Sequence, residues 1–198
     1  MSENFTIDII DRVQKTPGEH SELGSPDFVH MIIYDPDNHI KPLIKEKIGL
    51  EIINHVWRLE KPGELYVHEP DFFINYFTTL LDVIKDKIDT LPILYLIQWI
   101  EDKRPSSMST KYSIDINNEN WTIEGGWGKC KAKSSTGEEI DLISDPDKEF
   151  DGIYKGRKVK LIVKKHTYLE RFEPEINGFI EICKKAKSEN NLVRAEIS

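Results

Sequence analysis

The 198-residue sequence lacks several features that would assign it to a large class of proteins. No apolar stretch approaches the roughly 20 residues that a membrane-spanning helix needs. The most apolar run, residues 91–100, is followed at once by charged residues. The N-terminus has neither a basic segment nor the apolar core of a signal peptide. The only two cysteines, Cys130 and Cys183, lie far apart, which favours reduced thiols over a disulfide framework. We therefore expect a cytoplasmic protein with no membrane association.

Recognisable catalytic and metal-binding signatures are also missing. The six histidines form no close pair with metal-ligand spacing, and the segment around His68 and Glu69 lacks the second histidine of a zinc-binding helix. The glycines of residues 124–129 do not have phosphate-loop spacing. Cys130 has basic neighbours that would lower the pKa of its thiol, but no motif supplies the base that a catalytic cysteine needs. We predict no cofactor, no metal and no catalytic residue.

The charge of the chain is unevenly distributed. Its 27 basic and 35 acidic residues give a net charge of −8. Residues 1–40 carry eight acids against Arg12 and Lys15, and residues 138–151 carry seven acids against Lys148. The segment 155–165 then brings six positive charges, which suggests neighbouring strands whose charges offset each other. Because an acidic surface repels nucleic acid and attracts basic proteins, we predict a basic protein partner and no nucleic acid.

The first half of the chain mixes strand and helix patterns. Residues 4–13 alternate as a strand does, residues 14–27 have the composition of a polar loop, and the apolar run 28–34 indicates a second strand with His30 in the core. Residues 40–59 fit a helix or a strand equally well. Residues 69–88 repeat apolar side chains at helical spacing, and Thr90 with Pro92 indicates a second helix, so we expect a helix pair over about 69–103.

Hairpin strands dominate after residues 104–111, where we place a possible subdomain boundary. In the strand 158–164, lysines alternate with apolar residues, which describes a solvated face that would protect a sheet edge. A helix follows at about 173–190, and a strand closes the chain. The sequence therefore predicts one α+β domain over 1–198, in which the helices pack on a mainly antiparallel, twisted sheet.

Two Asp-Pro-Asp tripeptides are the best candidates for a site, since each follows an apolar run. Neither has the spacing of a calcium loop, because Ile40 and Phe150 occupy the glycine position. Aspartate bonds nearby amides and proline fixes φ, so both are predicted to be acidic turns. Trp127, isolated among glycines, is either an exposed anchor for an interface or a tryptophan buried against a strand. The predicted partner-binding residues are Asp35, Asp37, Trp127, Asp145, Asp147, Glu149 and Asp151.

Three functions fit these observations. The leading one is a non-catalytic, acidic protein-binding module. In size, acidity and absence of motifs the chain resembles bacterial immunity proteins, and this resemblance implies a toxin inhibitor that acts by steric occlusion of a basic partner. The alternatives are a small enzyme, whose carboxylates and histidine only the fold brings together, and a structural subunit of a larger assembly or homo-oligomer.

Overall fold

The computed structural model describes residues 4–48, 65–99, 111–116, 118–142, 149–154 and 156–197. The chain divides into two compact units, residues 1–89 together with 169–198, and residues 90–168. The subdomain boundary predicted near residues 104–111 lies outside the described residues except for Lys111. No helix in the described ranges is long and apolar enough to cross a membrane.

The first unit contains a four-stranded antiparallel sheet with the strand order β2-β1-β11-β3. In β1 every residue except Thr6 is buried, whereas buried and partly buried residues alternate along β11, and both segments are strands as predicted. The strands are β1 (Phe5–Ile10), β2 (Pro17–Gly24), β3 (Leu65–His68) and β11 (Leu192–Ile197).

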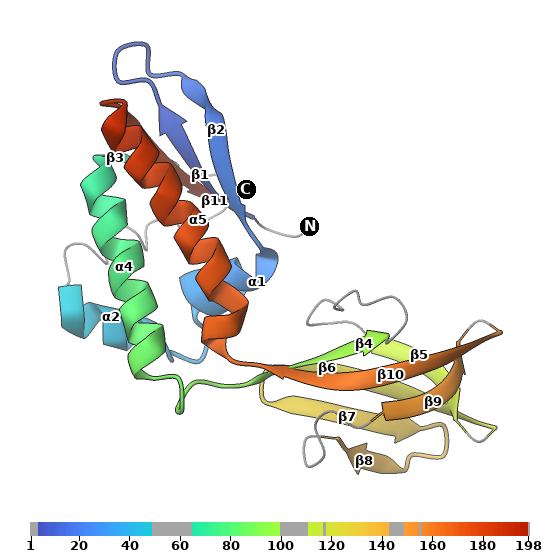
Figure 1. The fold of residues 1–198 in the computed structure, drawn as a ribbon. Helices are drawn as coiled ribbons and strands as arrows, with labels where there is room; N and C mark the ends of the chain where they lie inside the picture. Colours follow the sequence, from blue (N-terminus) through green and yellow to red (C-terminus); the bar gives the residue numbers. More distant parts are fainter. Residues whose placement is uncertain are drawn as a thin grey trace. The chain divides into compact units, whose positions relative to one another are not determined.

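Two antiparallel helices, α4 (Pro70–Asp86) and α5 (Tyr168–Ser188), lie side by side along one face of this sheet (Figure 1). Their apolar stripes meet in an aromatic core, where the rings of Phe77 and Phe179 lie 5.1 Å apart and Phe5 contacts both. The predicted amphipathic helices over 69–88 and 173–190 are therefore confirmed, although α5 begins earlier than expected.

The strand predicted over residues 28–34 is wrong, because these residues are helical. A short helix α1 (Pro26–Phe28) runs into a π-helix η1 (Val29–Tyr34), and α2 (Lys41–Ile48) follows. The Ser25 hydroxyl caps α1 by accepting a hydrogen bond from the Phe28 N–H at 3.2 Å. Most sides of η1 are buried, so its sequence is a continuous apolar run. A buried strand has the same sequence pattern, which is why the two cannot be told apart from the sequence. His30, predicted to be a core residue, is exposed.

The polar loop predicted over residues 14–27 is also wrong in its central part, which forms β2. Pairing with β1, from Phe5 opposite Gly24 to Ile10 opposite Pro17, makes this segment a strand despite its polar composition. As the outermost strand of the sheet, β2 lacks the apolar alternation that the sequence pattern requires. Of the ambiguous stretch 40–59, residues 41–48 are helical and residues 49–59 lie outside the described part of the chain.

The second unit is a seven-stranded antiparallel sheet with the order β4-β10-β9-β5-β6-β7-β8. The predicted hairpins are confirmed, but β10 is an interior strand between β4 and β9, so it protects no edge. Its strands are β4 (Leu94–Trp99), β5 (Lys111–Ile116), β6 (Glu119–Gly126), β7 (Lys129–Ser134), β8 (Glu139–Asp141), β9 (Glu149–Tyr154) and β10 (Arg157–His166).

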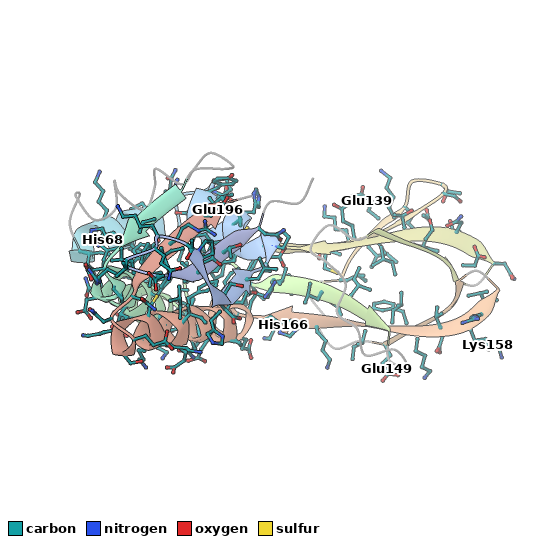
Figure 2. The ribbon with its side chains drawn as sticks, turned by 90° about the horizontal axis from the view of Figure 1, so that it is seen from above. His68, Glu139, Glu149, Lys158, His166 and Glu196 are labelled. Carbon is teal, nitrogen blue, oxygen red and sulfur yellow. The ribbon has the colours of Figure 1, made fainter. Side chains whose placement is uncertain are left out.

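This sheet curls until β4 meets the end of β6, as Figure 2 shows from above. Leu94 bridges Trp127, and the Gly128 N–H donates to the Ile93 carbonyl at 2.7 Å. Gly125 permits the approach, since a Cβ there would lie 2.4 Å from the Tyr95 carbonyl oxygen. The curl encloses Tyr95, Ile97, Trp121, Ile123, Cys130, Ala132, Leu142, Val159, Leu161 and Val163.

The second helix predicted from Leu91 is wrong, because residues 94–99 form β4. Leu94, Tyr95, Leu96 and Ile97 are all buried, and a strand buried on both faces has the same unbroken apolar pattern as a buried helix. The α+β class, the antiparallel pairing and the C-terminal helix are as predicted, and the strands are shared between two sheets instead of one.

Candidate functional site

The first Asp-Pro-Asp tripeptide is a turn, as predicted, and its first carboxylate serves the chain itself. Asp35 is only 2% exposed, and its oxygens accept the N–H groups of His39, Ile40 and Lys41 at 2.7–2.8 Å. It thereby satisfies free amides around the N-terminus of α2. Asp37 is exposed in the same turn. Of this pair, only Asp37 offers its side chain to another molecule.

The predicted contact residues around the second tripeptide fall into two groups. Asp145 and Asp147 lie outside the described residues. Glu149 and Asp151 belong to β9, where both carboxylates lie near the Lys160 ammonium of β10, at 3.4 Å and 3.7 Å. This pairing confirms the predicted compensation of charge between neighbouring strands. The Asp151 side chain remains 82% exposed, so it stays available to a partner.

Trp127 is partly buried at the point where the curled sheet closes. Its ring lies 4.4 Å from that of Tyr168, centroid to centroid. Packing of this kind gives the indole a structural role within the second unit.

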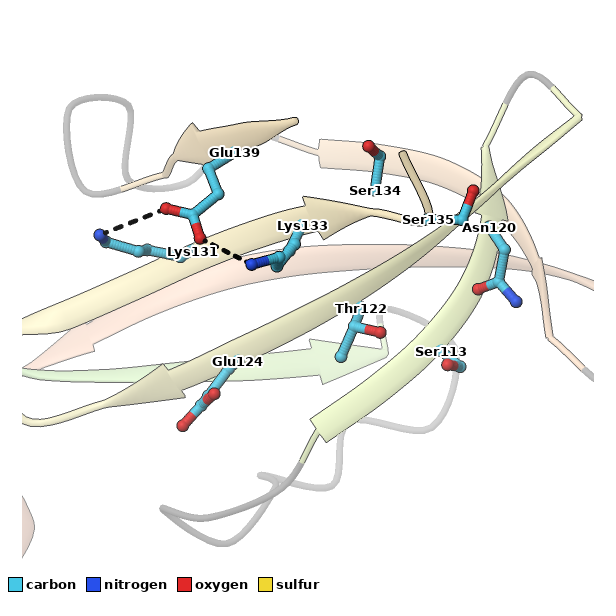
Figure 3. Close-up of a pocket in the computed structure, with 9 residues that line it drawn as sticks. All are labelled: Ser113, Asn120, Thr122, Glu124, Lys131, Lys133, Ser134, Ser135 and Glu139. Carbon is cyan, nitrogen blue, oxygen red and sulfur yellow. Dashed lines mark hydrogen bonds and ion pairs between the residues drawn. The ribbon is translucent and has the colours of Figure 1, made fainter. Parts of the chain in front are cut away.

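The outer face of the seven-stranded sheet is polar and carries two hollows on either side of β5. The first has a volume of about 430 Å³ and spans β5 to β8 (Figure 3). Glu139 lies between two lysines there, 3.8 Å from the Lys131 ammonium and 3.3 Å from that of Lys133. The lining residues are Ser113, Asn120, Thr122, Glu124, Lys131, Lys133, Ser134, Ser135 and Glu139.

The second hollow, of about 540 Å³, spans β5, β9 and β10. Ile153, which is 46% exposed, stands opposite Asp115 on β5 and Lys158 on β10. Asp151 precedes Ile153 by two residues and points to the same face of the strand. The hollow therefore surrounds an accessible apolar side chain with carboxylates and ammonium groups. Asn118, Gly152, Val159 and Lys160 complete its lining.

The side chains with the best-known catalytic chemistry lie elsewhere. Cys130 is fully buried in the core of the second unit, and this burial raises the pKa of its thiol to about 11. It is therefore a protonated thiol at neutral pH, and its lysine neighbours do not activate it. The His68 ring stacks on Phe72 at 4.3 Å, and its Nδ1 accepts the Glu69 N–H. Within the described ranges, no three histidine, cysteine or acidic residues are grouped to hold a metal.

The surplus of acid lies in the first unit. Residues 90–168 contain 12 acidic and 13 basic residues, for a net charge of +1, whereas the rest of the chain contains 23 acidic and 14 basic residues, for −9. Several acids in the first unit are bound to distant arginines. Asp8 pairs with Arg194, and Asp27 pairs with Arg171 at 3.1 Å. The acidic N-terminal quarter thus acquires basic partners that its local sequence does not contain.

No known protein family, curated protein or solved structure matches this chain. Sequence patterns did single out Glu149 and Asp151, but missed Asp115, Ile153 and the residues around the first hollow. The alternation of β5, β6 and β7 indicates which side chains face outward. It does not reveal which strands become neighbours, and that pairing creates the hollows.

Proposed function

We propose that this protein is a non-catalytic, cytoplasmic protein-binding module that covers a basic partner with the outer face of β5, β9 and β10. The observation that carries the proposal is the second hollow, where the half-exposed Ile153 is flanked by the carboxylates of Asp115 and Asp151. Such a surface favours inhibition by steric occlusion. When the partner binds to it, the partner's own contact face is covered and is no longer accessible to other molecules.

Cross-strand geometry supports recognition of a basic side chain there. Asp115 lies opposite Ile153, so Asp151, two residues earlier on β9, is its diagonal neighbour at about 7–8 Å. The aliphatic part of a partner's lysine or arginine can lie on Ile153 while its charged head contacts both carboxylates. Lys158 and Lys160 offset two of the three carboxylates of Asp115, Glu149 and Asp151, so one negative charge remains around Ile153.

The net charge of the chain supports the same class of partner. At −8 the protein attracts a basic protein over long range, and this attraction raises the association rate at low salt. Contacts at the hollow then provide specificity. Each charge-assisted hydrogen bond contributes roughly 1.5–3 kcal/mol, so removing both carboxylates weakens binding by tenfold or more.

The test compares affinity capture from the native cell on three immobilised proteins. These are the wild type, the double variant Asp115→Asn/Asp151→Asn, and the matched double variant Glu124→Gln/Glu139→Gln on the first hollow. We expect one basic protein to be enriched on the wild type and the matched control and lost from the first variant. When the captured basic protein is purified and mixed with this chain, we expect the association rate to rise as the salt concentration falls.

Either of two results contradicts the proposal. One is a partner that binds all three proteins equally, which places the contact elsewhere. The other is enrichment of no basic protein at all under low-salt conditions. Circular dichroism of each variant checks that the isosteric replacements leave the fold intact.

A further inference from the structure

The outer edge of β2 is an open strand edge in the first unit. β2 ends the strand order of the four-stranded sheet, and among the described residues it pairs with β1 alone. It lies at the margin of the sheet in Figure 1. Alternate residues of such a strand direct their N–H and C=O groups away from the sheet, where they can pair with another chain.

The C-terminal half of β2 lacks three of the usual features that prevent such pairing, namely a bulge, a proline and a lysine. The register irregularity and Pro17 both belong to its first half, whereas Ser21–Gly24 pair regularly with Asp8–Phe5. Residues 20–24 contain no lysine and no proline. Leu23 is 60% exposed on this edge, opposite Thr6. A regular, accessible edge with an exposed leucine is the form that strand addition requires.

The two faces of the edge differ in chemistry. Glu22 lies on the helix side, since its carboxylate reaches within 3.0 Å of the place that a Cβ on Gly178 would occupy. Leu23, the next residue, faces the opposite side of the sheet. An added strand would therefore meet carboxylate on one face and apolar surface on the other.

Charge selects the kind of strand that fits. Residues 16–27 contain three acids and no lysine or arginine, and α5 adds Glu175 and Glu181 near Gly178. Arg171 pairs with Asp27 and Glu175, and Lys184 pairs with Glu181 at 2.8 Å, so these two bases leave the acids around the edge in excess. A second copy of the chain would place acid against acid, which destabilises a ladder. We propose that residues 20–24 of β2 accept an extended, basic segment of a partner protein as a fifth strand of the four-stranded sheet.

The probe is a fluorescein-labelled peptide of sequence KVKVKVK, which alternates basic and apolar side chains. Its binding is measured by fluorescence anisotropy, alongside EVEVEVE and two isomers of KVKVKVK that are N-methylated at alternate amides. We expect KVKVKVK to bind and EVEVEVE not to bind. One methylated isomer loses binding at least tenfold, because one set of amides faces the protein, and the other isomer keeps it. Hydrogen exchange slows at residues 20–24 when the peptide binds.

Two variants locate the site. Leu23→Lys places a positive charge on the exposed edge and weakens KVKVKVK at least tenfold. Val67→Lys, on the opposite edge strand β3 where Val67 is 47% exposed, leaves the affinity unchanged. Both substitutions are at exposed positions, so far-UV circular dichroism stays that of the wild type.

Three results would overturn the inference. Absence of KVKVKVK binding at millimolar concentration excludes a basic strand. Equal binding of both methylated isomers shows attraction by charge without strand pairing. A concentration-dependent dimer in analytical ultracentrifugation that Leu23→Lys abolishes assigns the edge to a second copy of the chain. This site lies in the first unit, so its tests are independent of the proposed function, which the variants of Asp115 and Asp151 address.

Discussion

Replacement of Gly125 by alanine tests the closure of the curled sheet most directly. The added Cβ would lie 2.4 Å from the Tyr95 carbonyl oxygen, and Cβ contacts below 3.0 Å are essentially never found, so β4 and β6 must separate by at least 0.6 Å. The obstructing atom belongs to the backbone and cannot rotate away. Separation also strains the neighbouring hydrogen bond from Gly128 to Ile93.

The expected cost follows from these two effects. Overpacking of a tight contact costs about 1–3 kcal/mol, and loss of a hydrogen bond adds about 1 kcal/mol. We therefore expect Gly125→Ala to lower the free energy of unfolding by roughly 2–4 kcal/mol. Urea unfolding measured by tryptophan fluorescence reports it, because Trp99, Trp121 and Trp127 all lie in the second unit.

Gly178→Ala is the matched control. The nearest atoms to its Cβ would belong to the flexible side chain of Glu22, at 3.0 Å, and alanine is favoured over glycine in a helix by about 1 kcal/mol. This variant should unfold at the same urea concentration as the wild type or a higher one. If Gly125→Ala stays within about 0.5 kcal/mol of the wild type, the range of ordinary surface substitutions, then β4 and β6 do not approach this closely and our account of the closure is wrong.

Two further predictions concern buried groups. Burial raises the pKa of Cys130 from 9.0 to about 11. As the pH rises, the thiol therefore ionises in the unfolded protein before it does so in the folded one. The contribution of the buried thiol to the free energy of unfolding is fully present below pH 9 and is lost as the pH rises from 9 to about 11. Unfolding titrations should show about 1.4 kcal/mol of this loss by pH 10, absent from Cys130→Ala. Asp35→Ala leaves three amides without their acceptor and should cost about 2–4 kcal/mol in urea unfolding. Asp37→Ala, at an exposed position of the same turn, should change stability by less than about 0.5 kcal/mol, and an equal loss in both variants would contradict the capping role of Asp35.

The sequence by itself determined the elements whose side chains alternate between core and solvent. The helical spacing of α4 and α5 and the two-residue alternation of β10 and β11 are local properties, because one face of each element is buried and the other is more exposed. The turn at Asp35 and the pairing of Glu149 on β9 with Lys160 on β10 were also predictable, because both involve residues close together in the chain.

Tertiary structure decided everything that depends on which surface is covered. The runs 28–34 and 94–97 are buried on more than one side, so periodicity cannot separate the π-helix η1 from the strand β4. Polar residues 17–24 become a strand only because β1 pairs with them. The hollow around Ile153 and the open edge at Leu23 likewise exist only once strand order is fixed. Strand order joins residues far apart in the chain, and no local pattern encodes it.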